Sequence, residues 1–323
     1  MLKKPLAFGA ALMLSATAAI AQDFPSKPVT LMMPYAAGGP GDIITRTIGN
    51  GMSKVLKAQF VVENTAGAGG TIGTLKIANS PADGYSLLVM HLGHAANVAL
   101  YPTLPFDTEK DFIPVALLNN NPLVLTGRKS IPANSLAELA TWMKSNTAKM
   151  AHPGTGSTGH LSTFLVAQAM GVKVDHIPYR GAAPALQDII GGHVDLFFAT
   201  PQQVVNQVAS GQVKAFGITS KEPSPQFPGV RAFAQEYGPK LEVLYWHIML
   251  APAGTPKPIV DALNAAVQEM VDDPAVIKGW AETGVHPYPK DMRSTEAAAR
   301  YLKKEIDHWG QVVRDNKIEP PTK

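Results

Sequence analysis

The sequence predicts an α/β protein of two lobes. Short apolar segments alternate with segments of helical character, polar loops follow the apolar segments, and these loops fall into two sets well separated along the chain. Such alternation is typical of parallel sheets covered by helices. Because ligands of open α/β sheets bind beyond the carboxyl ends of the strands, the two sets of loops predict two sheets that face each other across a cleft.

The first residues predict an export signal rather than part of the fold. Lys3 and Lys4 precede an apolar run that ends at Ile20, and Ala19-Ile20-Ala21 fits the small-x-small cleavage rule, so we expect residues 1–21 to be removed after Ala21. No later segment is long and apolar enough for a membrane span. The mature chain is therefore expected to be exported, into the periplasm if the host has an outer membrane.

Composition is that of a compact globule with an ordinary hydrophobic core. The 323 residues are 46% hydrophobic and 16% charged, a balance and length that favour two lobes. There is no cysteine, so neither disulfides nor a lipid anchor on cysteine is expected. Without Lys3 and Lys4 the formal charge falls from +3 to +1. We expect a monomer. We expect no nucleic-acid partner, because no basic patch is present.

The predicted strands are short apolar runs, several of them apolar throughout, as expected of strands buried on both faces. They are VTLMM (29–33), FVVE (60–63), SLLVM (86–90), PLVLTG (122–127), VKVDHI (172–177), VDLFFA (194–199), VKAFGIT (213–219) and LEVLYWHIML (241–250), the last returning to the first lobe. The clearest helical segments between them are Asp42–Leu56, Leu136–Lys144, Leu161–Met170 and Pro184–Ile190.

Two packing helices are predicted in the last third of the chain. Thr255 is expected to cap a helix whose first position is Pro256. Apolar residues then recur at helical spacing, which predicts one buried stripe on each helix. The stripes are Ile259, Leu263, Ala266, Val267 and Met270 on the first helix, and Leu302, Ile306, Trp309 and Val313 on the second.

Six loops follow the strands. Loop 1 (Tyr35–Asp42), loop 2 (Asn64–Thr71) and loop 3 (His91–Asn97) belong to the first lobe, and loop 4 (His152–His160), loop 5 (Tyr179–Ala183) and loop 6 (Thr200–Gln202) belong to the second. Loop 1 places glycine backbone at the start of a helix, where free N–H groups and the helix dipole favour an anion without a basic side chain.

Two charged residues of these loops have alternative roles. Asp42 is expected to hold loop 1 by accepting N–H bonds near the helix start, and contact with a cationic ligand group is the alternative. Arg180 is the only Lys or Arg in the six loops. It can pair with a carboxylate through two hydrogen bonds, or be an exposed loop residue.

Known cofactor and metal motifs do not fit the loops. NTAGAGGTIG (64–73) lacks G-x-G-x-x-G, because Ile72 stands where the third glycine is needed, and it has no P-loop lysine. A nucleotide cofactor is not expected, and a smaller anion at the following helix N-terminus is left open. His91 and His94 form an H-x-x-H pair that nothing nearby completes, so we expect no metal and one or two imidazoles that line the pocket.

A hydrolase remains an alternative. The segment Gly156–Gly159 is not a G-x-S-x-G elbow, since position 155 is Thr155, but His160 lies close by and Asp195 sits on the following βα unit. The expected role of Ser157 and Thr158 is to hydrogen-bond a ligand oxygen.

Several segments resemble the successive signatures of the Bug (Bordetella uptake gene) family, the periplasmic solute-binding proteins of tripartite tricarboxylate transporters. They cover nearly the whole mature chain in order: FPSKPVTLMMPYAAGGPGD, VVENTAGAGGTIG, PADGYSLL, LYPTLPFDTEKDFIPVALL, HIPYRGAAPALQDIIGGHVDLFF and LAPAGTPKPIVDALN. The resemblance implies a two-lobe flytrap, similar to type II binding proteins, with two strands crossing at the hinge. Lobe one would comprise residues 22–122 and 244–323, and lobe two residues 123–243.

The resemblance also implies how a ligand is held. A carboxylate would be bound by backbone groups and ordered water against Tyr35–Asp42 and Ala66–Thr71, with lobe two closing from the other side. Loops and resemblance together predict these ligand contacts: Tyr35, Gly38, Gly39, Pro40, Asp42, Ala68, Gly69, Gly70, Thr71, His91, His94, Ser157, Thr158, Gly159, His160, Tyr179, Arg180, Gly181, Ala182, Asp195 and Thr200. No cofactor is implied.

Departures from the family pattern bear on the ligand. Met90, His91 and Leu92 replace small hydroxyl residues before the family histidine that matches His94, Ala36-Ala37 stands where proline is frequent, and the cysteines of many members are missing. The less polar wall favours a dicarboxylate with an apolar body, such as terephthalate or a medium-chain aliphatic diacid. The expected partner is the membrane permease of the transporter. The alternatives are a sensory binder for a receptor kinase and, in another class, a periplasmic hydrolase using Ser157 and His160.

Overall fold

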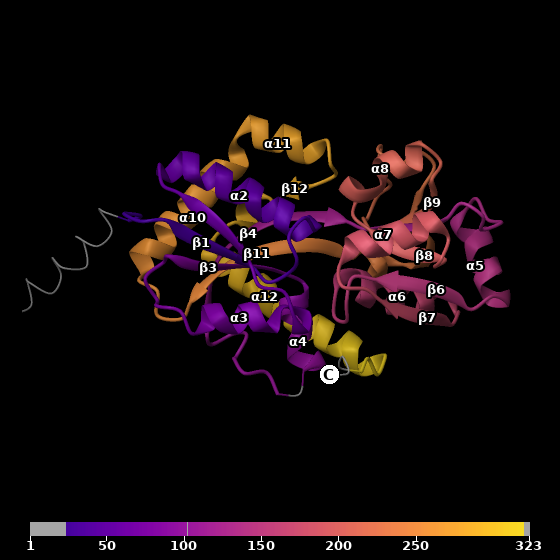
Figure 1. Cartoon of the computed structure of the whole chain (residues 1–323), viewed down its shortest axis with the longest axis horizontal. Coiled ribbons are helices and arrows are strands. Elements are labelled where there is room, and N and C mark those ends of the chain that lie inside the picture. The colour runs from indigo at the N-terminus through magenta and orange to yellow at the C-terminus, as the bar shows by residue number, and fades with distance from the viewer. Residues whose placement is uncertain (1–23, 102, 320–323) are drawn as a thin grey trace, which may run out of the picture.

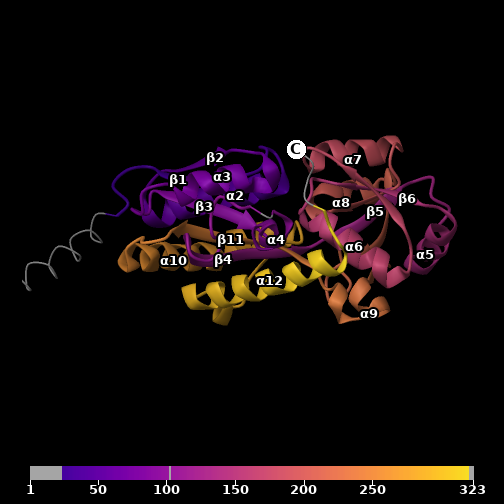
Figure 2. The ribbon, with the colours of Figure 1, turned by 90° about the horizontal axis from the view of Figure 1, so that it is seen from below.

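The computed structural model describes residues 24–101 and 103–319, and the predicted signal segment 1–21 lies outside them. Two six-stranded sheets form two lobes (Figures 1 and 2). Sheet A has the order β12 (His286–Pro287), β4 (Phe112–Pro122), β11 (Leu244–Pro252), β3 (Ser86–His91), β1 (Val29–Met33), β2 (Phe60–Asn64). Sheet B has the order β10 (Arg231–Ala232), β9 (Val213–Ile218), β5 (Val124–Arg128), β8 (Leu196–Ala199), β6 (Ala148–His152), β7 (Val174–Pro178).

Helices cover both faces of each sheet. They are α2 (Pro40–Leu56), α3 (Thr71–Ala78), α4 (Gly93–Leu100), α5 (Leu136–Ser145), α6 (Thr158–Met170), α7 (Ala182–Gly191), α8 (Pro201–Ala209), α9 (Phe233–Tyr237), α10 (Lys257–Asp272), α11 (Pro274–Ala281) and α12 (Thr295–Asp315), with short 3₁₀ turns η1 (Ala68–Gly70), η2 (Pro239–Leu241) and η3 (Lys290–Met292). Among the described residues, none of these helices combines the length and apolar character that a membrane crossing requires.

The central strands β1 and β3 of sheet A are mainly apolar because both of their faces are buried. Successive residues point to opposite faces, so Leu31 and Met33 join one core cluster with α2 and α10, whereas Met32 joins another with α3, α4 and α12. Sheet B is covered in the same way, by α5, α6 and α9 on one face and α7 and α8 on the other. Two covered faces per sheet explain why a near-continuous apolar pattern, rather than an alternating one, identified the strands.

The two-lobe α/β prediction is confirmed, and the sheets are mixed. β1 pairs with β2 and β3 in parallel, and β6 pairs with β7 and β8 in parallel, while β4 and β11 pair antiparallel in sheet A and β5 pairs antiparallel with both neighbours in sheet B. The antiparallel strands are those next to the crossings between lobes, where the chain enters one sheet and later returns from the other. The domain limits at 122/123 and 243/244 stay a prediction.

One predicted helix start is wrong. The helix after Thr255 begins at Lys257, and Thr255 donates its hydroxyl to Pro252 O (2.7 Å) instead of capping the helix. The side chain is thus used to close the turn that ends β11. The two predicted stripes are buried on α10 and α12.

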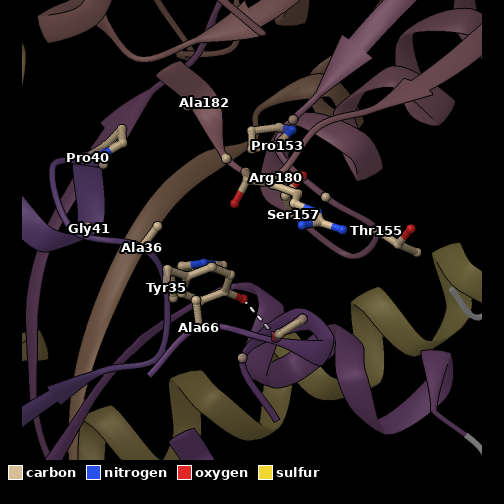
Figure 3. Close-up of a pocket in the computed structure, with 18 of the residues that line it drawn as sticks. Tyr35, Ala36, Pro40, Gly41, Ala66, Pro153, Thr155, Ser157, Arg180 and Ala182 are labelled. Carbon is tan, nitrogen blue, oxygen red and sulfur yellow. Dashed lines mark hydrogen bonds between the residues drawn. The ribbon is translucent and has the colours of Figure 1, made fainter. Parts of the chain in front are cut away.

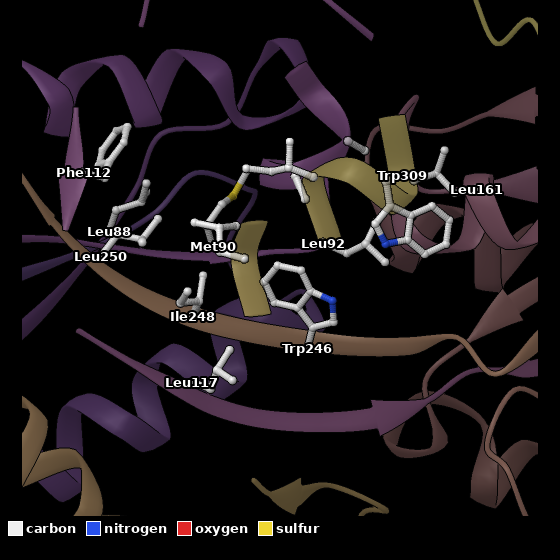
Figure 4. Packing of buried hydrophobic residues seen from close by; sticks show 14 of the residues in the cluster. Leu88, Met90, Leu92, Phe112, Leu117, Leu161, Trp246, Ile248, Leu250 and Trp309 are labelled. Carbon is white, nitrogen blue, oxygen red and sulfur yellow. The ribbon is translucent and has the colours of Figure 1, made fainter. Parts of the chain in front are cut away.

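The last helix links the lobes. Trp309 on α12 lies beside Leu161 of α6 in one apolar cluster (Figure 4). Glu305 Oε2 accepts hydrogen bonds from the indole N–H groups of Trp246 on β11 and of Trp309, each at 2.9 Å. The carboxylate of Glu305 therefore bonds α12 to β11, a strand at one of the crossings between the lobes.

A single threonine joins the two crossings. Thr219, buried at the end of β9, accepts a hydrogen bond from Leu123 N (2.8 Å) and donates to Val243 O (2.5 Å) through its hydroxyl. Its backbone N–H bonds Leu123 O, and its carbonyl accepts from Val243 N. Leu123 lies between β4 and β5, and Val243 directly precedes β11, so all four bonds lie at the hinge.

We expect Thr219→Val to loosen this junction. The valine keeps the shape but leaves one buried N–H and one buried C=O without a partner, which costs about 2–4 kcal/mol of the free energy of unfolding. Thermal unfolding of the variant checks this. Thr219→Ser, which keeps the hydroxyl and loses one methyl group, is the control and should cost only about 1 kcal/mol. Equal losses in both variants would contradict the hydrogen-bonding role.

Candidate functional site

A cavity of about 1190 Å³ lies between the lobes. In Figure 3 the loops that carry Pro153, Ser157 and Arg180 lie opposite those that carry Tyr35 and Ala66. The lining residues are Met33, Tyr35, Ala36, Ala37, Gly39, Pro40, Gly41, Asp42, Ala66, Gly67, Ala68, Gly69, Gly70, Thr71, His91, Tyr101, Thr103, Leu104, Pro105, Leu123, Pro153, Gly154, Thr155, Ser157, Thr158, Gly159, Tyr179, Arg180, Gly181, Ala182, Ala183, Pro184, Phe198, Thr200, Gln203 and Tyr245.

Five helices begin at this cavity. The first residues of α2 and α3 line it from lobe one and those of α6 and α7 line it from lobe two, while α8 contributes its N-cap Thr200 and Gln203, which form a capping box. The first N–H groups of a helix have no partner within the helix, and the helix dipole places partial positive charge there. Both walls are therefore suited to hold an anion, as the position of loop 1 predicted.

Loop 1 is held by Asp42. Its Oδ2 accepts from Gly38 N (2.9 Å) and from Arg46 Nε (3.0 Å), one turn further along α2. Burial raises the pKa of this carboxyl, but the bonds from Arg46 and Gly38 outweigh it and the pKa is lowered overall. The carboxylate thus bonds loop 1 back onto the start of α2. Gly39 and Gly41 line the cavity.

Tyr35 ties loop 2 to loop 1. Its hydroxyl donates to Gly69 O (2.8 Å), which also accepts from Asn97 Nδ2 on α4 (3.0 Å). Gly70 has a φ of +89°, and a Cβ there would lie 2.9 Å from Met90 Cε, so glycine is required both by the backbone and by the packing. The glycine-rich sequence thus allows loop 2 to pack closely against its neighbours, and it contains no phosphate-binding motif.

The floor of the lobe-one wall is aromatic and uncharged. The ring of His91 lies 4.4 Å from that of Tyr35 and 5.3 Å from that of Tyr245, measured between centroids. Burial, followed by the neighbouring His94, lowers the pKa of His91 to about 3, and Nδ1 accepts a hydrogen bond from Gly93 N. The imidazole is therefore neutral at neutral pH and offers no positive charge to a ligand.

Lobe two contributes the cavity's one lysine or arginine. Arg180 lies exposed in loop 5, next to Tyr179, whose hydroxyl is fixed by Asp188 Oδ2 at 2.5 Å. Loop 6 is fixed by a capping box in which Gln203 Oε1 accepts from Thr200 N at 3.1 Å. Among the described residues Arg180 takes part in none of the salt bridges.

Most of the predicted contacts line this cavity, and four do not. Those that line it are Tyr35, Gly39, Pro40, Asp42, Ala68, Gly69, Gly70, Thr71, His91, Ser157, Thr158, Gly159, Tyr179, Arg180, Gly181, Ala182 and Thr200. Gly38 is exposed beside it with its N–H on Asp42, and His94 is buried against Phe106 and Phe112. Neither residue is among those that line the cavity.

Asp195 and His160 also lie away from the cavity. Asp195 precedes β8, at the end of the strand opposite to Thr200, and pairs with Arg128 Nε (2.7 Å) and Lys149 N (2.8 Å). The βα spacing placed it in the right unit but at the wrong end. His160 is turned into lobe two, where its Nδ1 accepts from Gly156 N.

Some residues that line the cavity do not follow a strand and were not predicted from the sequence. The segment with Tyr101, Thr103 and Leu104 follows α4, so a rule based on the carboxyl ends of strands could not select it, although it is one of the segments that resemble the family. Tyr245 lies on the crossing strand β11, and Phe198 within β8. A count of aromatic residues near the crossings would have indicated Tyr245.

Comparison with known proteins assigns the chain to a family. Residues 44–318 match the model of the tripartite tricarboxylate transporter family receptor, named TctC. The chain belongs to this family. BugT of Bordetella pertussis is 31% identical over 91% of this chain and 91% of its own length, which agrees with the resemblance to Bug proteins.

Two solved structures of similar proteins from R. palustris hold carboxylates. MatC, with bound malate, is 38% identical with a TM-score of 0.83, and covers 90% of this chain and 100% of its own. The other, with adipate, is 30% identical with a TM-score of 0.86, and covers 93% of this chain and 100% of its own. TctC proteins are receptors and their structural neighbours are solute-binding proteins, so the protein is not an enzyme.

The hydrolase alternative is therefore wrong, and the geometry gives the reason. Ser157 Oγ accepts from His160 N (3.3 Å) as the cap of α6, and the His160 ring points to Gly156 rather than to the hydroxyl. Without a base beside it, the hydroxyl is a cap and a hydrogen-bonding group and not an activated nucleophile.

We expect Asp42→Asn to lower the melting temperature at neutral pH and to lose this effect in acid. The lowered pKa means that ionised Asp42 stabilises the fold above the unfolded-state pKa of about 4, and that this stabilisation disappears as the pH falls through the folded-state pKa. Melting curves between neutral and acidic pH check this. Asp261→Asn, which breaks an exposed pair with Lys257 on α10, should change little at any pH.

Proposed function

We propose that the protein captures a small dicarboxylate in the interlobe cavity and delivers it to the membrane permease of a tripartite tricarboxylate transporter. We further propose that it works in the periplasm after removal of residues 1–21. Both follow from its membership of the receptor family and from the carboxylates in the two R. palustris structures.

The observation that carries the proposal is the convergence of four helix N-termini, those of α2, α3, α6 and α7, on a cavity with little side-chain charge. Arg180 is the one Lys or Arg and Asp42 the one Asp or Glu among the lining residues, and Asp42 is already paired with Arg46. Backbone N–H groups and bridging water bind a carboxylate without a buried ion pair, which avoids the cost of desolvating a basic side chain. A sugar or a cation would bind this arrangement less well than a carboxylate.

Donors on both walls favour a ligand with two acid groups. One carboxylate would meet the starts of α2 and α3, and the other would meet α6, α7 and Arg180. Tyr35, Tyr245 and Phe198 lie along the cavity between them, which favours an apolar or aromatic body such as that of terephthalate or a medium-chain aliphatic diacid. The similar proteins from R. palustris bind malate and adipate, two dicarboxylates of different chain length.

A thermal-shift screen tests the ligand class. Since a ligand that binds only the folded protein raises the melting temperature, terephthalate, adipate and their longer homologues should raise it more than benzoate or hexanoate, which lack the second acid group. Sugars and amines should leave it unchanged. A shift with a sugar or an amine and none with any carboxylate would overturn the proposal.

Gly39→Pro tests loop 1 as a backbone donor. Gly39 has φ −76° and ψ 167°, which proline adopts without strain, and its added Cβ would lie 3.4 Å from Ala36 O. The variant should fold with an unchanged melting temperature and bind the diacid about tenfold more weakly, because one donor N–H is lost. Calorimetric titration checks this. Gly39→Ala keeps the N–H and is the control. Unaltered affinity in Gly39→Pro would exclude this donor.

Arg180→Gln tests the assignment of the second acid group. We expect the affinity for a dicarboxylate to fall about tenfold or more, while that for a monocarboxylate of equal length changes little, because only the distal group meets the guanidinium. Arg300→Gln, exposed on α12 and far from the cavity lining, is the matched control. Equal weakening for both ligand types would assign Arg180 to the single carboxylate instead.

A further inference from the structure

Three histidines of lobe two form a cluster outside the carboxylate site. His152 ends β6, His160 lies in the first turn of α6 and His176 lies within β7, and one ring nitrogen of each lies within 4.8 Å of those of the others. Among the described residues this is the only group of three or more His, Cys, Asp or Glu side chains so arranged. None of the three lines the cavity.

The fold brings them together through the register of two parallel strands. Met150 pairs with His176, so His152, two residues further along β6, points to the same face of the sheet as His176. That face is covered by α6, which supplies His160. The ring centroids of His152 and His160 are 4.1 Å apart, and those of His160 and His176 are 5.2 Å apart.

The three rings are neutral and two have a free nitrogen. Burial, together with the neighbouring histidines, lowers the pKa of His160, and burial lowers the pKa of His152 to about 4. A neutral imidazole keeps one lone pair for a metal or a proton. Nδ1 of His152 and Nδ1 of His176 are buried with no hydrogen-bond partner among the described residues, which costs free energy unless something binds them.

We propose that His152, His160 and His176 bind one divalent transition-metal ion of the Zn²⁺ type. Three imidazoles are a common protein ligand set for Zn²⁺, with water in the fourth position. Nitrogen ligands of a tetrahedral Zn²⁺ lie about 3.4 Å apart, given Zn–N bonds of about 2.1 Å, so small rotations of the rings close the set. Imidazole ligands exclude Ca²⁺ and Mg²⁺, which take oxygen.

Binding has a consequence for loop 4. The one lone pair of neutral His160 now accepts the hydrogen bond from Gly156 N at 3.2 Å, so coordination through either ring nitrogen gives up this bond. Gly156 lies between Gly154 and Ser157, which line the cavity. The metal thus joins the two ends of loop 4, His152 and His160, directly behind the wall of the carboxylate site.

Metal titration of the full mature chain, without an affinity tag and freed of metal with a chelator, tests the proposal. We expect one Zn²⁺ per chain by calorimetry, a higher melting temperature with Zn²⁺ present, and the intense visible absorption of tetrahedral Co²⁺ when Co²⁺ is used as the probe. Replacing one ligand should raise the Kd for Zn²⁺ about 100-fold in His176→Gln. His176 is only partly buried, so this variant should keep its fold and its metal-free melting temperature.

His193→Gln is the matched control, because His193 is an exposed histidine of the same lobe and lies outside the cluster. Its Kd for Zn²⁺ should equal that of the parent chain. The proposal is overturned if the parent chain binds no Zn²⁺, or if His176→Gln and His193→Gln bind it equally well. Because the test uses metal alone, its outcome is independent of whether a dicarboxylate binds.

Discussion

The whole site depends on a hydrogen-bonded junction where the chain crosses twice between lobes. Thr219 bonds both crossings, at Leu123 and at Val243, and all the groups involved are backbone apart from its own hydroxyl. Buried backbone groups must be paired, so the two crossings are held side by side at this point. Each sheet then presents the carboxyl ends of its parallel strands, and the helices that follow them, to the same cavity.

A site built from helix starts has different physics from one built on arginine or lysine. Charge from helix N-termini is distributed and fixed, and it needs no counter-ion when the site is empty. The neutral state of His91 and the pairing of Asp42 with Arg46 are consistent with this design, because neither adds a net charge to the wall. We propose that specificity among carboxylates depends on the shape of the cavity, on aromatic side chains such as Tyr35 and Tyr245, and on Arg180, all of which line it.

Hydrogen bonds also hold the loops of the cavity in place from behind its lining. Tyr35 connects loops 1 and 2 through Gly69, and Asn97 of α4 bonds the same carbonyl. On the other lobe, Ser157 caps α6, while His160 holds Gly156. Fixing a loop before the ligand arrives lowers the entropy lost on binding. A metal at the histidine cluster would replace the bond between His160 and Gly156 by a link between His152 and His160, in lobe two alone.

The sequence alone determined the class of fold, most strands and loops 1 to 6. It could do so because strands buried on both faces leave a near-continuous apolar signal, and because glycine-rich turns at helix starts are visible as residues. Seventeen of the predicted contacts line the cavity for this reason. Asp195 lies in none of loops 1 to 6 and was predicted through its βα unit and the resemblance. Sequence spacing assigns a residue to such a unit but does not say at which end of the strand its side chain is used.

Tertiary structure alone decided what depends on the meeting of distant segments. The role of Thr219 needs Leu123 and Val243 beside it, and the cavity's Tyr245 needs β11 to return between the lobes. The histidine cluster is formed by residues of β6, α6 and β7, whose register cannot be read from spacing. The sequence therefore shows the H-x-x-H pair at His91 but not the group of His152, His160 and His176. Residue types fix the local chemistry, whereas packing of the sheets decides which of them meet.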